Sequence, residues 1–240
     1  HKVGILFVII LIFYIVYAFA GSFFITNETG TNRWSNGTFY NTTTTSDGEN
    51  VTLNTTYASL PYSCPSSVTG HYTVYDNGDT CTITFQPNAT YGKDTILYDE
   101  RTNYNYGSAE QAIIGSFSND YNHRRLAIWF NLSVIPSTAN ITFARFRLYV
   151  YSNDYSKSEQ FDMYPLTQSW VEGTKNNDAC STGATWNTYD CSNSWPGGAG
   201  AGNDVGSLVG NGSSVADGNW MNVYLNTTAV ESCLLYTSPG

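Results

Sequence analysis

Charged side chains are scarce in this chain, and basic ones are the scarcest. Lys and Arg number 10 against 19 Asp and Glu in 240 residues, which gives a formal net charge of −9. Because nucleic-acid binding is driven by Lys and Arg that neutralise phosphates, this balance argues against a nucleic-acid partner. Helix-favouring residues are also few after residue 25, where Tyr, Thr, Asn, Ser and Gly dominate. Short apolar stretches rich in β-branched and aromatic residues predict an all-β fold.

The motifs of common enzymes and metal sites are absent as well. The three His lie in unrelated segments and no Gly-x-Ser-x-Gly motif occurs, so a Ser–His–Asp hydrolase has no evident nucleophile. No Cys-x-x-Cys pair or His-x-x-x-His spacing supports a zinc site. A glycosidase needs two carboxylates about 5–10 Å apart, and the sequence brings no such pair together. We therefore predict a protein without catalytic residues.

The first 25 residues have a composition of their own. Lys2 precedes an apolar run over residues 3–20 that ends in Ala18-Phe19-Ala20, the layout of a secretory signal peptide cleaved after Ala20. Alternatively, the run continues through residues 23–25 and stays as a membrane anchor, since about 20 apolar residues span a bilayer. Both interpretations place the rest of the chain outside the cell.

Asn-x-Ser/Thr sequons are frequent along the whole chain and predict a glycosylated, extracellular or cell-surface protein. They are Asn27, Asn36, Asn41, Asn50, Asn54, Asn88, Asn131, Asn140, Asn211 and Asn226. Residues 26–60 hold half of these sequons, are rich in Thr and Asn, and show little apolar periodicity. We expect this segment to be a glycosylated linker or stalk that is disordered without its sugars.

The five cysteines predict two disulfide bonds. Residues 232–240 change composition abruptly and resemble the translated read-through of a sequencing adapter, although an ordinary apolar strand is the alternative. The chain also begins with His, so we expect both ends to be incomplete. Without Cys233, an even set remains for an exported protein: Cys64, Cys81, Cys180 and Cys191. Three pairings are open, and we favour the local ones, Cys64–Cys81 and Cys180–Cys191. The second bond would contribute about 3 kcal/mol in the loop-entropy model.

Alternating apolar residues predict the strands of an antiparallel sandwich. A disulfide-stapled hairpin is expected within residues 61–90, because Asn77-Gly78 suits a primed turn with positive φ at both central residues. Two later strands have inward-facing sets, because side chains two apart share a face. These sets are Leu126, Ile128, Phe130 and Leu132 in one strand, and Ala144, Phe146, Leu148 and Val150 in the other. Residues 220–225 are the last predicted strand, and the Gly-rich segment 173–219 is a predicted loop.

The outward-facing residues of those two strands are candidates for binding carbohydrate. The set is Trp129, Arg145, Arg147, Tyr149 and Tyr151. Aromatic rings stack on the apolar faces of sugars, and a guanidinium pairs bidentately with a uronate carboxylate. The set forms one site only if its strands are neighbours. The alternative is a solvated or second-sheet face, on which the rings merely stabilise cross-strand pairs. A glycan on Asn131 would crowd Trp129.

A second group of polar residues is a candidate for structural Ca²⁺. Its members are Asp94, Asp99, Asn103 and Asn105, whose carboxylate and carbonyl oxygens are the ligands that Ca²⁺ prefers. The alternative is a cluster of Asx turns around Asn105. Trp170, with Glu172 beside it, and Trp186 are expected to be structural, because Trp rings near loop bases usually plug the ends of a sandwich core.

Several short motifs of residues 86–231 occur in the order and spacing of a known family. They are Asp94-Thr-Ile-Leu97, Asn105-Tyr-Gly-Ser108, Arg125-Leu-Ala-Ile-Trp-Phe-Asn-Leu-Ser133, Ile135-Pro136, Ala139-Asn-Ile-Thr-Phe-Ala144, Arg147-Leu-Tyr149, Thr167-Gln-Ser-Trp-Val-Glu172 and Thr185-Trp186, followed by residues 220–230. This region resembles a DNRLRE domain, the disaggregatase-related family that overlaps carbohydrate-binding module family 96. The resemblance implies a jelly-roll-like β-sandwich of secreted or cell-surface proteins, with carbohydrate binding in characterised members. Asn131 stands where the family usually has Asp, and the closing strands expected after residue 231 are missing.

These observations predict an exported glycoprotein whose sandwich binds a polysaccharide or a cell-envelope glycan. Membrane contact is expected only through residues 3–25. The first alternative is a structural surface-layer or adhesin spacer that acts through protein–protein contacts. The second is an accessory module of a larger polysaccharide-degrading enzyme.

Overall fold

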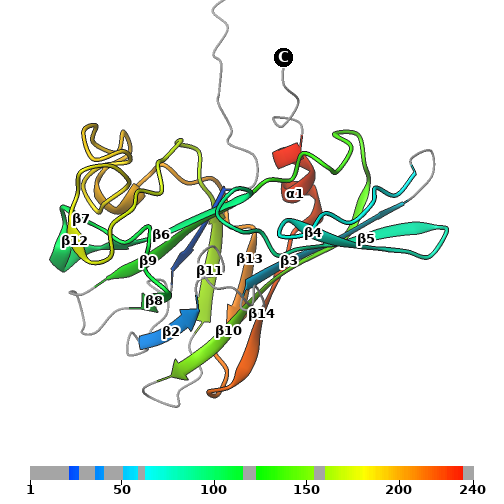
Figure 1. The fold of residues 1–240 in the computed structure, drawn as a ribbon, viewed down its shortest axis with the longest axis horizontal. Coiled ribbons are helices and arrows are strands. Elements are labelled where there is room, and N and C mark those ends of the chain that lie inside the picture. Colours follow the sequence, from blue (N-terminus) through cyan, green and yellow to red (C-terminus); the bar gives the residue numbers. More distant parts are fainter. Residues whose placement is uncertain are drawn as a thin grey trace, which may run out of the picture.

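The computed structural model describes residues 22–26, 36–40, 51–58, 63–115, 123–153 and 160–234, and in these ranges the chain is all-β with one short α-helix (Figure 1). The strands up to the middle of the chain are β1 (Ser22–Thr26), β2 (Asn36–Tyr40), β3 (Val51–Ala58), β4 (Tyr72–Asp76), β5 (Thr80–Phe85), β6 (Gly92–Tyr98), β7 (Tyr104–Asn105), β8 (Gln111–Gly115) and β9 (Arg124–Phe130). The later strands are β10 (Ile141–Asn153), β11 (Gln160–Pro165), β12 (Asp178–Ala179), β13 (Gly210–Ser213) and β14 (Asn219–Leu225). Two 3₁₀ turns, η1 (Asp99–Arg101) and η2 (Ala199–Ala201), and helix α1 (Thr227–Leu234) complete the described elements.

The strands form a sandwich of two antiparallel layers (Figure 1). One layer has the order β4-β5-β3-β10-β14, and the other has the order β6-β9-β1-β11-β13. Hydrogen bonds between β13 and β14 join the layers at one side. At the other side, β2 pairs with β10 of the first layer and with β8, which in turn pairs with β9 of the second layer. The small sheet of β7 and β12 lies outside this arrangement. The predicted all-β antiparallel fold is therefore confirmed.

The main core lies between the layers and is built from alternate residues of the long strands. Both predicted inward sets, Leu126 to Leu132 and Ala144 to Val150, are buried in it. The rings of Phe130 on β9 and Phe146 on β10 meet edge to face, with centroids 6.1 Å apart. This contact fixes β9 and β10 as facing strands of opposite layers. Their outward side chains therefore point away from each other.

The predicted hairpin is confirmed as β4 and β5, but its turn differs from the prediction. Gly78 has a φ of 89°, whereas Asn77 does not have the positive φ that a primed turn requires at both positions. Instead, the Asn77 side-chain oxygen accepts hydrogen bonds from the backbone N–H groups of Asp79, at 3.1 Å, and Thr80, at 2.7 Å. This Asx arrangement stabilises a longer turn.

Both predicted disulfide bonds are present. Cys64 bonds to Cys81, with 5.5 Å between their Cα atoms, and so ties the segment before the hairpin to β5. Cys180 bonds to Cys191, with 5.8 Å between their Cα atoms, within the long segment that follows β11. Cys233 is the free cysteine of the described residues, and it is buried.

The sandwich begins earlier in the chain than predicted. Strand β3 lies between β10 and β5, and its Leu53 is 0% exposed, so the prediction of a disordered linker over residues 26–60 is wrong for residues 51–58. Strand β2 is likewise paired with β8 and β10. The β-branched Thr residues explain the difference, because they favour strands even where a segment looks linker-like.

The predicted membrane anchor is also corrected in part. Residues 22–25 belong to β1, which is hydrogen-bonded between β9 and β11, rather than to a spanning helix. Residues 1–21, 27–35 and 41–50 lie outside the described residues, and the predicted signal peptide falls among them. No helix in the described ranges is both long enough and apolar enough to cross a bilayer.

The C-terminal residues that looked like a separate tail form the end of α1. The helix is capped by Asn226, whose side-chain oxygen accepts a hydrogen bond from the N–H of Thr228 at 3.0 Å. Leu234 is 0% exposed and packs in the main core. Residues 232–234 therefore belong to α1 and not to a strand, while residues 235–240 lie outside the described part.

We expect Phe146→Ala to lower the free energy of unfolding by about 3–5 kcal/mol, because it opens a cavity in the main core. Phe143→Ala is the matched control, since Phe143 lies on the same strand and is 36% exposed. It should cost less than about 1 kcal/mol. Urea denaturation followed by far-UV circular dichroism measures both. Equal losses would contradict the inner and outer faces assigned to β10.

Candidate functional site

The structure separates Trp129 from the other four predicted carbohydrate-binding residues. Because β9 and β10 face each other across the core, Trp129 and Arg147 lie on opposite outer faces of the sandwich. The prediction of one shared face is therefore wrong for Trp129. Alternation gave the outward direction of each side chain, but it carried no information about which layer each strand joins.

Trp129 lies beneath a covering segment, residues 166–209, rather than on an open surface. This segment and the outer face of β6 and β9 share a second apolar cluster, made of Leu97, Ala127, Leu166, Trp170, Ala184, Trp195 and Ala201. Trp129 and Trp186 pack against that cluster and are partly buried. The Lys93 ammonium lies 5.2 Å from the Trp129 ring centroid. Trp170 and Trp186 thus cover the outside of a layer, instead of plugging the end of the main core as predicted.

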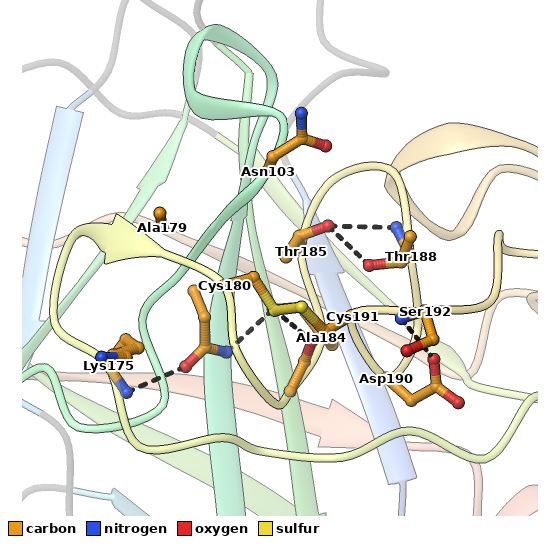
Figure 2. Close-up of a disulfide and its surroundings, with 12 residues drawn as sticks. Asn103, Lys175, Ala179, Cys180, Ala184, Thr185, Thr188, Asp190, Cys191 and Ser192 are labelled. Atoms are coloured by element: carbon orange, nitrogen blue, oxygen red, sulfur yellow. Dashed lines mark hydrogen bonds between the residues drawn. A yellow bond between two sulfur atoms is a disulfide. The ribbon is translucent and has the colours of Figure 1, made fainter.

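The covering segment is organised around Asn105, which is fully buried. The Asn105 amide donates to the backbone carbonyls of Glu172, at 2.7 Å, and Ala184, at 2.9 Å. Its side-chain oxygen accepts from the N–H groups of Gly107, at 3.2 Å, and Lys175, at 3.1 Å. The Cys180–Cys191 bond closes the same region (Figure 2). Every polar atom of the Asn105 side chain therefore holds protein backbone.

The four candidate Ca²⁺ ligands have separate partners. Asp99 Oδ2 lies 2.9 Å from His123 Nδ1, and Asn103 Oδ1 accepts from the Asn187 amide at 2.9 Å. Asp94 is buried, and its N–H donates to Glu172 Oε1 at 3.0 Å. Within the described ranges, no group of three or more His, Cys, Asp or Glu is placed to hold a metal ion. The geometry favours the alternative of Asx turns around Asn105.

Four of the predicted residues do share one open face. Arg145, Arg147, Tyr149 and Tyr151 follow one another at alternate positions of β10, and Tyr151 is 51% exposed. Strand β14 adds three side chains to this surface in register: Tyr224 lies opposite Arg145, Asn222 opposite Arg147, and Trp220 opposite Tyr149. We call these seven residues the arginine–aromatic face. The contribution of β14 was not predicted, although alternation in residues 220–225 carried the signal.

Rings hold both guanidinium groups on this face. The Arg147 guanidinium lies 4.5 Å from the Trp220 ring centroid, and Arg145 lies 5.7 Å from the Phe143 ring. Trp220 in turn packs edge to face with Tyr149 at 5.5 Å. Cation–π contacts of this kind contribute roughly 0.5–1 kcal/mol each at exposed sites. The two arginines are therefore positioned by rings and not by acidic side chains.

The electrostatics of the face are unusual for an acidic protein. Among the described residues, neither Arg145 nor Arg147 forms an ion pair with a carboxylate. The Nε atoms of Arg145 and Arg147 are buried and have no hydrogen-bond partner among the described residues. The same holds for Oδ1 of Asn222. Partial burial, together with the neighbouring Arg145 charge, lowers the pKa of the Arg147 guanidinium below its ordinary value. The face thus carries two adjacent positive charges that nothing described neutralises.

The other edge of β10 supplies a polar rim. Asn54 on β3 lies directly opposite Arg145, and its amide donates to Thr84 Oγ1 at 2.9 Å. The Thr52 hydroxyl donates to Asn54 Oδ1 at 3.2 Å. Since Asn54 is also a sequon, a glycan there would lie beside the guanidinium of Arg145.

The remaining sequons fall into three groups. The exposed ones are Asn88, Asn140, Asn211 and Asn226. Asn131 is half-buried, and its side-chain oxygen accepts from the N–H of Ser133 at 3.0 Å. Asn36 begins β2, and Asn27, Asn41 and Asn50 lie outside the described residues.

We expect Trp129→Ala to lower the free energy of unfolding by about 2 kcal/mol, because the ring packs beneath the covering segment. Tyr151→Ala should change it by less than about 0.5 kcal/mol, because Tyr151 is an exposed residue of the arginine–aromatic face. Guanidinium denaturation monitored by tryptophan fluorescence compares the two. A Trp129 variant as stable as the Tyr151 variant would show that the covering segment does not depend on this ring.

No known family model matches this chain, and no curated protein and no solved structure matches it either.

Proposed function

We propose that the arginine–aromatic face binds an acidic polysaccharide, and that the protein is an exported, non-catalytic carbohydrate-binding module. The observation that carries the proposal is the pair of adjacent guanidinium groups that is framed by aromatic rings and has no carboxylate partner among the described residues. A uronate carboxylate pairs bidentately with a guanidinium, and the neighbouring rings stack on the apolar face of the sugar. Such a ligand supplies the negative charge that the face lacks.

The spacing along β10 favours a polymer with repeated charges. Residues two apart in a strand are separated by about 7 Å, so Arg145 and Arg147 present two charges in a row along one line. Tyr149 and Tyr151 continue that line over the same face. Because β10 is hydrogen-bonded on both edges, its side chains are held on a rigid base and lose little entropy on binding.

The wider sequence supports this assignment. The resemblance to DNRLRE domains implies a jelly-roll-like sandwich with carbohydrate binding, and its Arg147-Leu-Tyr149 motif lies within the proposed site. Two disulfide bonds fit an oxidising compartment, as does the number of sequons. We therefore place the protein outside the cell or on its surface. The same binding role suits an accessory module of a polysaccharide-degrading enzyme.

One observation favours a structural spacer instead. Because Asn54 lies directly opposite Arg145, a glycan on it would cover part of the arginine–aromatic face. In that case the rings would contact the protein's own sugar, and the sandwich would act as a surface-layer or adhesin spacer. The occupancy of this one sequon separates the two functions.

The direct test measures binding to polygalacturonate by affinity electrophoresis, with dextran as the neutral polymer. We expect Arg147→Ala and Trp220→Ala each to weaken binding at least tenfold without unfolding the domain. Lys93→Ala is the matched control, because it removes a positive charge beside Trp129, on the opposite outer face, and should leave retardation unchanged. Equal retardation by dextran, or unchanged binding in both face variants, would contradict the proposal.

A second prediction concerns the sequon at the edge of the face. In protein made by a host that attaches N-glycans, Asn54→Gln should strengthen binding to polygalacturonate several-fold, because it removes a glycan beside Arg145. Asn140→Gln is the control, since Asn140 is an exposed sequon that precedes β10 and does not belong to the arginine–aromatic face. Mass spectrometry establishes occupancy. An occupied Asn54 whose removal leaves the affinity unchanged would show that the ligand binds elsewhere.

A further inference from the structure

A pocket lies where β6 ends, η1 follows and β9 begins. Its volume is about 230 Å³, and its polar lining consists of Tyr98, Glu100, Arg101, Tyr106, Arg124 and Asn177. Ile96 and Ile113 supply apolar walls. At about 30 Å³ per water molecule, this space corresponds to roughly eight waters. It therefore suits a single sugar ring and is too small for a longer oligosaccharide.

The pocket is positively charged although the chain is acidic. The Tyr98 hydroxyl donates to the Glu100 carboxylate and accepts from Arg124 Nη2 at 3.1 Å, so one tyrosine links the acidic and the basic group. The Arg101 guanidinium lies 5.2 Å from the Tyr104 ring centroid and has no carboxylate partner among the described residues. Two guanidinium groups and one carboxylate thus line the pocket.

The far wall of the pocket comes from the covering segment. The Tyr106 hydroxyl donates to Asn177 Oδ1 at 2.8 Å, so the Asn177 amide N–H groups are not used in this bond. Burial raises the pKa of Tyr106 to about 12, so its hydroxyl stays protonated and keeps this role. Asn177 has a φ of 52°, a conformation that Asn tolerates better than most residues. Its neighbour Asp178 pairs with Asn105 in the small sheet of β7 and β12.

We propose that this pocket binds one carboxylate-bearing sugar unit, independently of the arginine–aromatic face. Arg101 and Arg124 receive the carboxylate, because guanidinium groups match its geometry. Glu100 and the Asn177 amide bind ring hydroxyls as acceptor and donor. The isoleucines pack against the apolar face of the sugar ring. The ligand is a free uronic acid or the terminal unit of a uronate chain.

Isothermal titration of the purified full chain with glucuronate, galacturonate and a reduced-end digalacturonate tests the proposal. Glucose and sulfate serve as the neutral and the purely anionic probes. We expect at least one uronate to bind, Arg101→Ala to weaken that binding at least tenfold, and Lys93→Ala, beside Trp129 and outside both sites, to leave it unchanged. Tighter binding of the disaccharide than of either monosaccharide identifies a chain end as the ligand.

Three results would overturn the proposal. Sulfate binding as tightly as the uronates would show an anion site without sugar recognition. Glucose binding equally well would remove the role of the arginines. Full affinity in both Arg101→Ala and Glu100→Gln would place the sugar outside the pocket. Because Arg147→Ala reports on the arginine–aromatic face and Arg101→Ala reports on the pocket, failure of one proposal leaves the other intact.

The Cys180–Cys191 bond offers a second readout. The paired Cys180→Ser and Cys191→Ser variant should loosen the segment that carries Asn177, weaken uronate binding at least fivefold and leave polygalacturonate binding unchanged. Near-UV circular dichroism of Trp residues checks that the sandwich stays folded. Unchanged uronate affinity in a folded double variant would contradict the role of Asn177.

Discussion

Strand β10 is hydrogen-bonded along both edges, to β14 on one side and to β3 and β2 on the other, and this placement organises the molecule. A strand held in this way cannot rotate, so its alternate side chains have fixed destinations. One set, which includes Phe146 and Leu148, fills the main core. The other set forms the arginine–aromatic face. The same backbone hydrogen bonds thus stabilise the fold and keep the proposed site rigid.

The two outer faces of the sandwich differ in whether another segment of the described chain covers them. The face of β6 and β9 is buried under the long covering segment. This segment needs little regular structure, because Asn105 forms hydrogen bonds with its backbone groups and the Cys180–Cys191 bond limits its conformations. Gly107 allows the backbone of the covering segment to pack closely against it, since a Cβ at this position would lie only 2.2 Å from the carbonyl oxygen of Glu172. The face of β10 and β14 has no such cover among the described residues. An uncovered aromatic surface on the face opposite a covered one supports the proposed binding role of the open face.

Local patterns in the sequence predicted much of the fold and part of the site. Alternation predicted the inner and outer sets of β9 and β10, and the cysteine spacing predicted both disulfide bonds. The layer to which β9 belongs depends on long-range pairing, so Trp129 was assigned to the wrong face. The Thr-rich residues of β3 lacked a strong apolar signal, because a strand whose outer face is polar needs only Leu53 and a few small side chains in the core. The pocket could not be predicted at all, since Asn177 and Arg101 are far apart in the chain.

The proposed binding of an acidic polymer by an acidic protein raises an electrostatic difficulty, which the distribution of charge resolves. At physiological ionic strength charges are screened over about 8 Å, so the net charge of −9 acts weakly on a ligand that approaches one face. At contact, the proposed ligand would meet Arg145 and Arg147, whose mutual repulsion is offset, among the described residues, by aromatic rings. A carboxylate that arrives between them relieves that repulsion and gains charge-assisted hydrogen bonds. Among the described residues no carboxylate relieves this repulsion, so an anion that binds there would relieve it, which supports the proposed role of the face as a binding site.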